Sequence, residues 1–379
     1  MVKNDIDILI LGGGCTGLSL AYYLSFLPNT VRIFLIENKF IYNNDKTWCG
    51  WRTKNHAFVK CCKIFWYSYY INKTTKYCSI INSSIPYENI KSIIFYKKIL
   101  NRIQHSSNIK LYHKECVRIT EYNNYVSVKL NNETYKTASW AIDTTPKFLK
   151  IPYYSPWKWQ NFIGLEIELY SKIIGFEKPY LMNFFINKYL KYNKINFLYV
   201  LPNKLNEFLF EWTSFSDKDK IFINTLLLFN INLILGKYNY KLLRNETGHI
   251  PMAYVTNKTR IKNLVTLYGS YIRTSNGFSF HEIQSWAIKC AYNLSINKEL
   301  ILPNISYFLL FFDYIFMKTI ELYPKLSLFL YTNLFYKINS NSLIYFFTNT
   351  SKLFDLLNIL FFIQPKTKFL YTIFFYLFN

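Results

Sequence analysis

Residues 6–37 hold the sequence pattern that limits the choice of fold more than any other. An apolar run over 6–11 leads into the glycine-rich sequence Gly-Gly-Gly-Cys-Thr-Gly at 12–17, and a helix-compatible stretch follows over 18–27. A second apolar run then ends at Glu37, twenty residues past the last glycine. Strand, G-x-G-x-x-G, helix, strand and acid, in this order, are the fingerprint of a dinucleotide-binding unit. The pattern therefore predicts an α/β protein with a dinucleotide site near its N-terminus.

Each residue of the fingerprint has a physical role. Gly12 allows the tight turn, Gly14 lets the backbone approach a pyrophosphate, and Gly17 lets the helix pack closely on the strand. The helix N-terminus offers unpaired N–H groups to the phosphates. Glu37 would accept hydrogen bonds from ribose hydroxyls. The alternative is a glycine-rich turn of an α/β protein that binds nothing.

The chain is long and strongly basic. Its 379 residues are enough for two or three domains, its formal net charge is +23, and one residue in five is aromatic. A basic balance suggests an anionic partner, either nucleic acid or a lipid surface. However, Lys, Asn, Ile, Tyr and Phe are all encoded by AT-rich codons, so drift in base composition is a sufficient cause. Without a basic cluster or a nucleic-acid motif, we expect no nucleic-acid partner.

Cysteine and histidine usage indicates a reducing compartment. The seven cysteines are odd in number and form no C-x-x-C, and the five histidines never pair at metal-ligand spacing. Disulfides, a zinc site and a redox dithiol are therefore not expected. The N-terminal apolar run has the features of a first strand and not of a signal peptide. No run of 18 uninterrupted apolar residues occurs, so we expect a cytoplasmic protein without a clear membrane span.

The segment after the fingerprint contains two tryptophans in a polar loop predicted over 41–55. Trp48 and Trp51 would form an aromatic floor under a flavin or an apolar ligand, or simply fill the core. Further along, the pattern predicts short strands over 60–90, an amphipathic helix over 92–103, and strands over 110–117 and 125–130.

A buried strand is predicted over 140–146, and it ends in an acid and a turn. In folds with two dinucleotide motifs this strand end closes the nucleotide site, so Asp143 is a candidate cofactor residue. An Asx turn or a helix cap is the alternative role for Asp143.

Four strand-like runs follow, and they predict an inserted antiparallel sheet. The runs cover 162–170, 180–186, 196–201 and 208–215. Glu211 lies in the fourth run between Phe210 and Trp212. If Glu211 faces an apolar cavity, its pKa is raised and it can donate a proton. The alternative is that Glu211 is only the polar position of an amphipathic strand, while the neighbouring Trp212 is a candidate wall of the substrate pocket.

A second anion site is predicted near the end of the nucleotide-binding unit. Residues 242–252 are predicted as a loop, 263–269 as a strand, and 281–293 as a helix. The connection over 269–280 is rich in Gly, Ser and Thr, and its cofactor candidates are Gly269, Asn276 and Gly277. A strand, such a loop and a helix N-terminus together attract an anion, although an ordinary capped turn would have the same pattern.

Beyond residue 303 the chain becomes very aromatic, in runs interrupted by Asp, Lys, Asn or Pro. This pattern favours amphipathic helices over membrane spans. The helices would cover a cavity for a long apolar ligand, lie on a membrane surface, or form plain core. We therefore expect three units: residues 1–150 together with 255–300, an inserted sheet over 151–254, and a C-terminal helical cap over 301–379.

These segments together resemble the lycopene β-cyclase family of FAD-dependent carotenoid enzymes, over roughly residues 5–370. Three short motifs that follow one another along the chain are more specific for this family than the glycine fingerprint. They are Asp-Lys-Thr-Trp, Leu-Pro…Glu-x-Thr and Gly-x-Ile-Pro. The carrying segments are 12–17 with Glu37, 44–51, 197–202, 211–216, 246–251 and 275–279. The resemblance implies a Rossmann-like FAD/NAD(P)-binding flavoprotein fold with an inserted antiparallel sheet and a C-terminal helical region.

The resemblance also implies a reaction. Members of the family convert the ψ-ends of lycopene, through γ-carotene, into β-ionone rings without net redox change, using reduced FAD and NAD(P)H as reductant. The family's essential acid corresponds to Glu211, and no metal is implied. The hydrocarbon substrate would come from a membrane surface, so we expect a cytoplasmic protein that associates peripherally with membranes.

The chain departs from the family pattern at two places. Asn183 follows Leu-Met where the family usually carries an exchangeable Asp, and the second flavin loop between Gly269 and Arg273 lacks an Ala-Gly-Gly run. Two other functions therefore stay open. One is another FAD enzyme of the same fold, such as a monooxygenase or an isoprenoid reductase, and the other is a degenerate membrane-associated protein without flavin.

Overall fold

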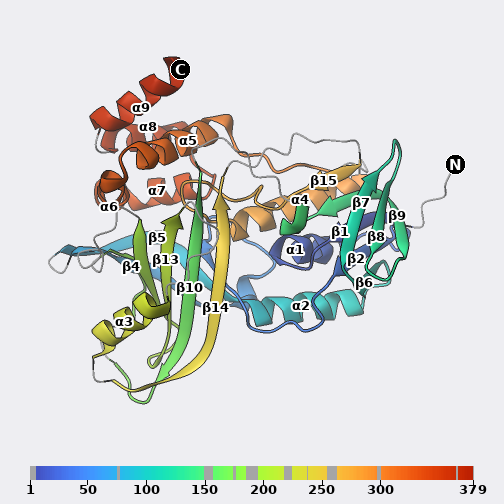
Figure 1. Cartoon of the computed structure of the whole chain (residues 1–379), viewed down its shortest axis with the longest axis horizontal. Helices are drawn as coiled ribbons and strands as arrows, with labels where there is room; N and C mark the ends of the chain where they lie inside the picture. Colours follow the sequence, from blue (N-terminus) through green and yellow to red (C-terminus); the bar gives the residue numbers. More distant parts are fainter. Residues whose placement is uncertain are drawn as a thin grey trace.

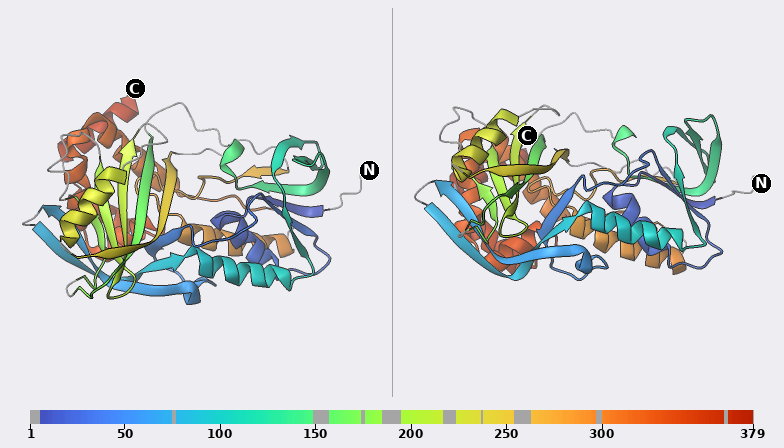
Figure 2. Two further views of the ribbon diagram at one scale, coloured as in Figure 1. Left: turned by 60° about the horizontal axis from the view of Figure 1, so that its bottom comes forward. Right: turned by 90° about the horizontal axis from the view of Figure 1, so that it is seen from below.

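In a computed structural model of the chain, two sheets lie side by side, and helices pack against each of them (Figure 1). The structure describes residues 6–74, 77–148, 157–173, 176–184, 195–216, 224–236, 238–253, 263–296, 300–363 and 366–378. The first sheet lies near the N-terminus, and the C-terminal helices lie at the opposite end of the molecule in every ribbon view (Figure 2).

The first sheet has seven strands in the order β6-β2-β1-β9-β8-β7, and β15 also pairs with β9. Its strands are β1 (Ile6–Leu11), β2 (Ile33–Glu37), β6 (Ile109–His113), β7 (Cys116–Glu121), β8 (Val126–Leu130), β9 (Tyr135–Asp143) and β15 (Leu264–Thr266). The central pairs, β1 with β2 and β9, are parallel, whereas β7, β8 and β9 pair antiparallel. This arrangement is a Rossmann-like βαβ core extended by an antiparallel meander.

Three helices pack on the first sheet: α1 (Cys15–Leu24), α2 (Ser92–Gln104) and α4 (Phe280–Ile296). The predicted strand–helix–strand order over 6–37 is confirmed. Helix α1 begins three residues before the predicted start at residue 18, because Gly14 already serves as its N-cap. The predicted helix over 92–103 is confirmed as α2.

The second sheet has eight strands in the order β14-β10-β13-β12-β11-β4-β5-β3. Its strands are β3 (Thr47–Trp51), β4 (Cys62–Thr74), β5 (Tyr77–Lys91), β10 (Lys158–Leu169), β11 (Tyr180–Asn183), β12 (Asn196–Pro202), β13 (Glu207–Ser216) and β14 (Tyr240–Met252). All pairs are antiparallel except β11 with β4. The four predicted strand runs are β10 to β13, although residues 185 and 186 of the second run lie outside the described residues.

Two sequence predictions in this sheet were wrong: residues 47–51 of the predicted polar loop form β3, and the predicted loop over 242–252 is the edge strand β14. The predicted strands over 60–90 are confirmed, but they are two long strands and not several short ones. Because β14 pairs with β10 on one side only, many of its residues are exposed and show no apolar alternation. The strands from residues 47–91 also extend the sheet beyond the predicted insert.

The two faces of β13 have different neighbours. Helix α3 (Asn224–Leu235) packs on one face, where Phe208, Phe210 and Trp212 form a core with Leu227 and Ile231. Leu209 and Phe215, at odd-numbered positions of the same strand, belong to the large core shared with the C-terminal helices. Successive strand residues point to opposite faces of a sheet, so Glu211 lies on the face away from α3.

In the described part of the chain after residue 300, five helices extend the core of the second sheet: α5 (Tyr307–Leu322), α6 (Ser327–Lys337), α7 (Ser340–Phe347), α8 (Leu353–Phe362) and α9 (Lys366–Phe378). A buried bidentate ion pair, Arg273 with Asp313, joins α5 to the connection before α4, with both N···O distances at 2.7 Å. Among the helices in the described part of the chain, none is long and apolar enough to cross a membrane.

Candidate functional site

A cavity of about 860 Å³ lies where the two sheets meet. Its wall is formed by segments from both sheets and their connections. These segments are the turn before α1, the end of β2, the start of β3, the cavity-facing side of β13, the end of β14 and the connection before α4. Gly14, Glu37, Gly277 and Glu211 line this one cavity. Its volume lies in the range typical of ligand and cofactor sites.

The three fingerprint glycines have different surroundings. Gly12 has a φ of +97°, and a Cβ atom there would lie 2.7 Å from Oγ1 of Thr144. A Cβ at Gly17 would lie 1.9 Å from the carbonyl oxygen of Gly12, closer than any contact tolerates. Gly14, by contrast, lines the cavity, and its Cβ would meet nothing within 4 Å. Gly12 and Gly17 therefore enable the close turn, whereas Gly14 leaves backbone open to a ligand.

The start of α1 and the end of β2 frame the cavity. Gly14 supplies no capping side chain, so the first N–H groups of α1 are available to an anion. Cys15, in this first turn, has its pKa raised to about 12 by burial, so its thiol adds no negative charge. Glu37 accepts hydrogen bonds from the N–H groups of Gly13 and, at 2.7 Å, Lys39. Its carboxylate can accept further bonds, since it has about four acceptor sites.

The predicted second anion loop reaches the same cavity. Gly269 and Gly277 have φ values of +78° and +76°, which favour glycine. Asn276 holds the turn by accepting the N–H of Phe278 at 2.9 Å. Gly269, Asn276 and Gly277 all line the cavity, and a Cβ at Gly277 would lie 2.6 Å from Oε1 of Gln160.

Asp143 does not line the cavity. Its Oδ1 accepts hydrogen bonds from the backbone N–H of Thr145 at 2.9 Å and from the Thr145 hydroxyl at 2.7 Å. This geometry is the Asx turn that the sequence left open as the alternative. Asp143 thus shapes the strand end, and the cavity is lined by its neighbour Thr144.

Glu211 faces the cavity from the middle of β13. The Thr213 hydroxyl donates a hydrogen bond to its Oε1 at 3.2 Å. Burial, together with the nearby charge of Glu246, raises the pKa of Glu211 to about 8. The carboxyl group therefore carries its proton at neutral pH, as a general acid requires.

A second glutamate, Glu246, lies beside Glu211, and it was not among the predicted site residues. The strand register places Glu211 on β13 and Glu246 on β14 opposite the same residue of β10, Gly164. Arg244 donates a hydrogen bond to Oε2 of Glu246, and the Thr47 hydroxyl does so at 3.0 Å. The sequence held only an indirect signal, since Glu246 begins the Gly-x-Ile-Pro segment.

The three candidate tryptophans divide between the cavity and the core. Trp48 lines the cavity. Trp51 and Trp212 are each only 1% exposed and do not line it, which corrects their prediction as substrate walls. Trp51 packs between Tyr87 and Phe278, and Trp212 faces α3 because it is the strand neighbour of Glu211.

The two departures from the family pattern also have defined places. Asn183 is buried at the end of β11 and does not line the cavity. The short connection after Gly269 is held by Arg273, which is fully buried and also donates to the carbonyl oxygen of Phe346 at 2.6 Å. This anchor gives the shortened loop a defined path along the cavity wall.

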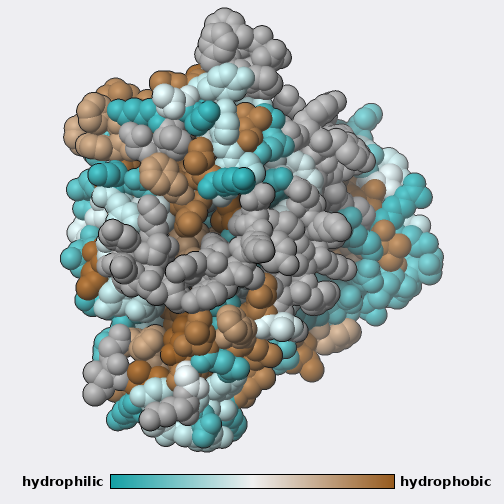
Figure 3. All heavy atoms as spheres, turned by 60° about the vertical axis from the view of Figure 1, so that its left-hand side comes forward, coloured by the Kyte–Doolittle hydropathy of each residue, from teal (hydrophilic) through white to brown (hydrophobic). Residues whose placement is uncertain are grey.

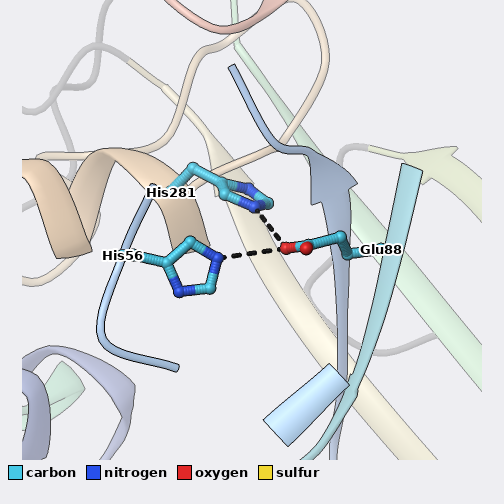
Figure 4. A group of neighbouring side chains, drawn as sticks. All are labelled: His56, Glu88 and His281. Carbon is cyan, nitrogen blue, oxygen red and sulfur yellow. Dashed lines mark hydrogen bonds and ion pairs between the residues drawn. The ribbon is translucent and has the colours of Figure 1, made fainter. Parts of the chain in front are cut away.

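A histidine cluster that the sequence did not reveal lies near the start of α4 (Figure 4). His56 and His281 both contact Oε2 of Glu88 through Nε2, at 3.0 and 3.2 Å. These groups lie close enough together to hold a metal ion. However, Nδ1 of His56 accepts the N–H of Phe58 at 3.2 Å, so Nε2 carries the proton and donates to Glu88. Arg52 also forms an ion pair with Oε1 of Glu88 at 2.8 Å, so the charge of the carboxylate is already balanced without a metal ion.

Comparisons with known proteins agree with this architecture. A sequence model described as lycopene cyclase protein matches residues 7–305. No curated protein sequence matches the chain.

Solved structures are similar in fold alone, because their sequence identities are very low. A geranylgeranyl bacteriochlorophyll reductase-like protein from Thermoplasma acidophilum has a TM-score of 0.62 and 12% identity, over 96% of this chain and 98% of that chain. A flavoprotein/dehydrogenase from Cytophaga hutchinsonii has a TM-score of 0.58 and 10% identity, over 97% and 98%.

Aklavinone-11 hydroxylase, solved with FAD and aklavinone, has a TM-score of 0.55 and 11% identity, over 78% of this chain. The present chain spans only 63% of the length of that hydroxylase. The predicted fold class, a Rossmann-like flavoprotein fold with an added sheet and a C-terminal helical region, is confirmed.

Proposed function

Because the chain belongs to the lycopene cyclase family, we propose that it is a lycopene β-cyclase. It converts the ψ-ends of lycopene into β-ionone rings, through γ-carotene to β-carotene, and is thus an intramolecular lyase or isomerase. The observation that carries this proposal is the single cavity that joins the glycine turn of a dinucleotide site to Glu211. A protonated carboxyl group beside a cofactor site is what acid-initiated ring closure requires.

The residues around the glycine turn fit FAD. Open backbone at Gly14, the N–H groups of α1 and the acceptor Glu37 match the pyrophosphate and ribose of a dinucleotide. The hydroxyl of Tyr271 and Oε1 of Gln160, both on the cavity wall, are buried without a hydrogen-bond partner among the described residues. Reduced FAD, maintained by NAD(P)H, would supply negative charge that stabilises a cation without transferring hydride.

In the proposed reaction, Glu211 donates its proton to C2 of the ψ-end, which leaves a cation at C1. The C5=C6 double bond attacks C1 through C6, which forms the ring bond and moves the cation to C5. The C6 proton then leaves to the carboxylate of Glu211 or to solvent, which forms the C5=C6 double bond of the ring and restores neutrality, so no electrons enter or leave. A hydrocarbon offers no hydrogen-bonding groups, and the aromatic residues Tyr87, Phe278 and Tyr199 on the cavity wall position it and stabilise the cation through their ring faces.

The test is expression in cells that accumulate lycopene, where ring closure changes the pigment from red to orange. Glu211→Gln keeps the size of the side chain but removes the transferable proton. We expect at least a ~100-fold loss of ring formation, the usual contribution of a general acid, with flavin binding retained. Full activity of this variant, measured by pigment chromatography with added reductant, would contradict the role of Glu211.

A second candidate function is an FAD-dependent monooxygenase or reductase. The observation that favours it is the similarity of fold to a hydroxylase and to a reductase-like protein. Such an enzyme oxidises NAD(P)H in proportion to its product, whereas a cyclase needs reductant only in catalytic amounts. A degenerate homologue, the third candidate, would yield a purified protein without a flavin spectrum.

We also propose that the protein takes its substrate from a membrane surface. Helix α8 exposes Leu353, Phe354, Leu357 and Phe361, each more than half accessible to solvent. Lys352 precedes this apolar surface, which lies among the C-terminal helices where hydrophobic residues reach the exterior (Figure 3). An apolar helix face with adjacent lysine suits the boundary between lipid head groups and acyl chains.

A further inference from the structure

We propose that Glu246 is a positioning residue: it shares one proton with Glu211 across Gly164 and so keeps the Glu211 carboxyl protonated. The use of this proton in ring closure rests on the proposed function, but the carboxyl pair itself follows from the geometry. Glu211, Gly164 and Glu246 occupy one row across the adjacent strands β13, β10 and β14. Their side-chain positions consequently share one face of the sheet.

The absence of a side chain at Gly164 makes room for the pair. A Cβ at this position would lie 3.0 Å from Cγ of Glu246 and 3.2 Å from Cδ1 of Leu209. The position lies in the middle of a buried strand, where glycine is unfavourable unless another group needs the space. Here the side chain of Glu246 occupies that space, with its Oε1 3.5 Å from the position of such a Cβ, and it lies near enough to Glu211 for its charge to raise the pKa of that carboxyl group.

The surroundings decide which glutamate is ionised. Arg244 and the Thr47 hydroxyl both donate to Oε2 of Glu246, and Lys46 donates to the neighbouring carbonyl oxygen of Thr247. Oε1 of Glu246 is buried and accepts no hydrogen bond from the described residues. Glu211 accepts its hydrogen bond from the neutral Thr213 hydroxyl; among the described residues no Lys or Arg side chain forms an ion pair with it, and the charge of Lys46 acts on it only at longer range. Burial raises the pKa of Glu246 as well, but Arg244, Thr47 and Lys46 oppose that rise. Of the two carboxyl groups, Glu246 is therefore the one that better holds negative charge, and its Oε1 is available to accept the proton held by Glu211.

The other titratable groups that face the pair do not change this balance. Tyr199 on β12 lies opposite Glu211 in the strand register, and Cys49 on β3 and Tyr87 on β5 act on it from the far side of the cavity. Burial raises the pKa of all three, so they are neutral at neutral pH.

Two further charged residues, Glu166 and Lys91, lie beyond Glu211 and Glu246, and they form an ion pair with each other. Glu166 accepts hydrogen bonds from Arg244 and from Lys91. The charge of Arg244 is thus divided between Glu166 and Glu246. Glu211 and Glu246 together keep one proton, because two adjacent buried carboxylates cannot both ionise at neutral pH.

The direct test measures the protonated carboxyl by infrared difference spectroscopy of the purified holoprotein between pH 5 and 9. The wild-type spectrum minus that of Glu211→Gln is expected to contain a carboxylic acid band that disappears near pH 8. In Glu246→Gln the band should disappear at a pH lower by at least about one unit. Because this measurement needs no substrate, it separates the carboxyl pair from the proposed reaction.

Two conservative variants distinguish charge from packing. Glu246→Asp keeps the charge and alters the shape, whereas Glu246→Gln keeps the shape and removes the charge. Charge sharing predicts that the pH at which the band disappears is highest in wild type, intermediate in the Asp variant and lowest in the Gln variant. A purely structural role for Glu246 predicts the reverse order of the two variants, which would overturn the proposal.

Gly164 and a distant glutamate complete the design. Gly164→Ala by itself should lower the pH at which the band disappears. Combined with Glu246→Gln, it should cause no further decrease, because both changes disrupt the same interaction. Glu168→Gln removes a carboxylate from the same strand, outside the cavity lining, and should leave the band unchanged. If the band disappears at the same pH in Glu246→Gln as in wild type, the proposed proton sharing between Glu211 and Glu246 is wrong. A shifted band without any ring formation from lycopene would refute only the proposed function.

Discussion

At the scale of single residues, the raised pKa of Glu211 links stability to pH. In the unfolded chain a glutamate ionises near pH 4.5, whereas in the folded protein Glu211 keeps its proton to about pH 8. Between these values the folded state binds a proton that the unfolded state has released. The free energy of unfolding should therefore decrease as the pH rises from 5 to 8.

Glu211→Gln should reduce this pH dependence, since Gln does not titrate. Urea denaturation at pH 5 and pH 8 measures it, with wild type and variant compared at both values. Glu88 does not interfere, because hydrogen bonds from His281 and His56 outweigh its burial and hold its pKa at about 2, below this interval. An equal slope in wild type and variant would mean that Glu211 is ionised throughout.

Residue-scale prediction from sequence succeeded where a local pattern was sufficient. Glu211 was identified as a candidate acid on a strand, and the structure brings it to the cavity. Glu246 could not be paired with it in the same way, since the two meet only through the register of β10. Trp212 was assigned to the substrate pocket because the side of β13 that would face α3 was unknown from sequence.

At the scale of elements, the turn between β1 and α1 contains one glycine that we expect to act in cofactor binding, Gly14, and one that the fold itself requires, Gly17. Gly14→Ala places a methyl group in open space on the cavity wall, at a φ of −80° that alanine readily adopts. If this backbone contacts a pyrophosphate, we expect at least a ~10-fold loss of flavin affinity with an unfolding free energy within about 0.5 kcal/mol of wild type.

Gly17→Ala is the matched comparison, because its methyl group would lie 1.9 Å from the Gly12 carbonyl oxygen. This variant should lose several kcal/mol of stability through overpacking. Flavin fluorescence and thermal unfolding measure the two effects separately. Unchanged flavin affinity in Gly14→Ala would contradict the assignment of this turn to the cofactor.

Elements were predictable from sequence where one strand or helix buries a regular face. Helix α2 has such a face, whereas strands β1 and β10 to β13 were predictable as apolar runs that are buried at most positions. β14 has neither pattern, because an edge strand with many exposed residues needs no apolar alternation. β3 was missed because its five residues, two of them tryptophans, lie between polar segments, and its partner β5 lies about forty residues away.

At the scale of the whole molecule, the fold positions chemistry between its two sheets. The first sheet contributes the glycine turn and Glu37 to the cavity wall, and the second contributes Glu211, with Glu246 beside it on β14. The Arg273–Asp313 ion pair connects the C-terminal helices to the loop that lines the cavity. A single chain thus places an acid, a cofactor cradle and an apolar cap around one space, and long-range pairing that no local pattern encodes produces this arrangement.

The exposed apolar face of α8 gives a prediction about the molecule as a whole. Replacing both Phe354 and Phe361 by Ser removes apolar area that would enter lipid, but both side chains are mostly exposed, so folding should be little affected. We expect at least a ~10-fold loss of binding to vesicles containing anionic lipid, since burial of large apolar side chains contributes a few kcal/mol. Leu242→Ser is the control, because it removes an exposed apolar residue that lies outside α8, near the start of the edge strand β14. Vesicle co-sedimentation measures the affinities, and equal binding of the double variant and wild type would exclude α8 as the membrane contact.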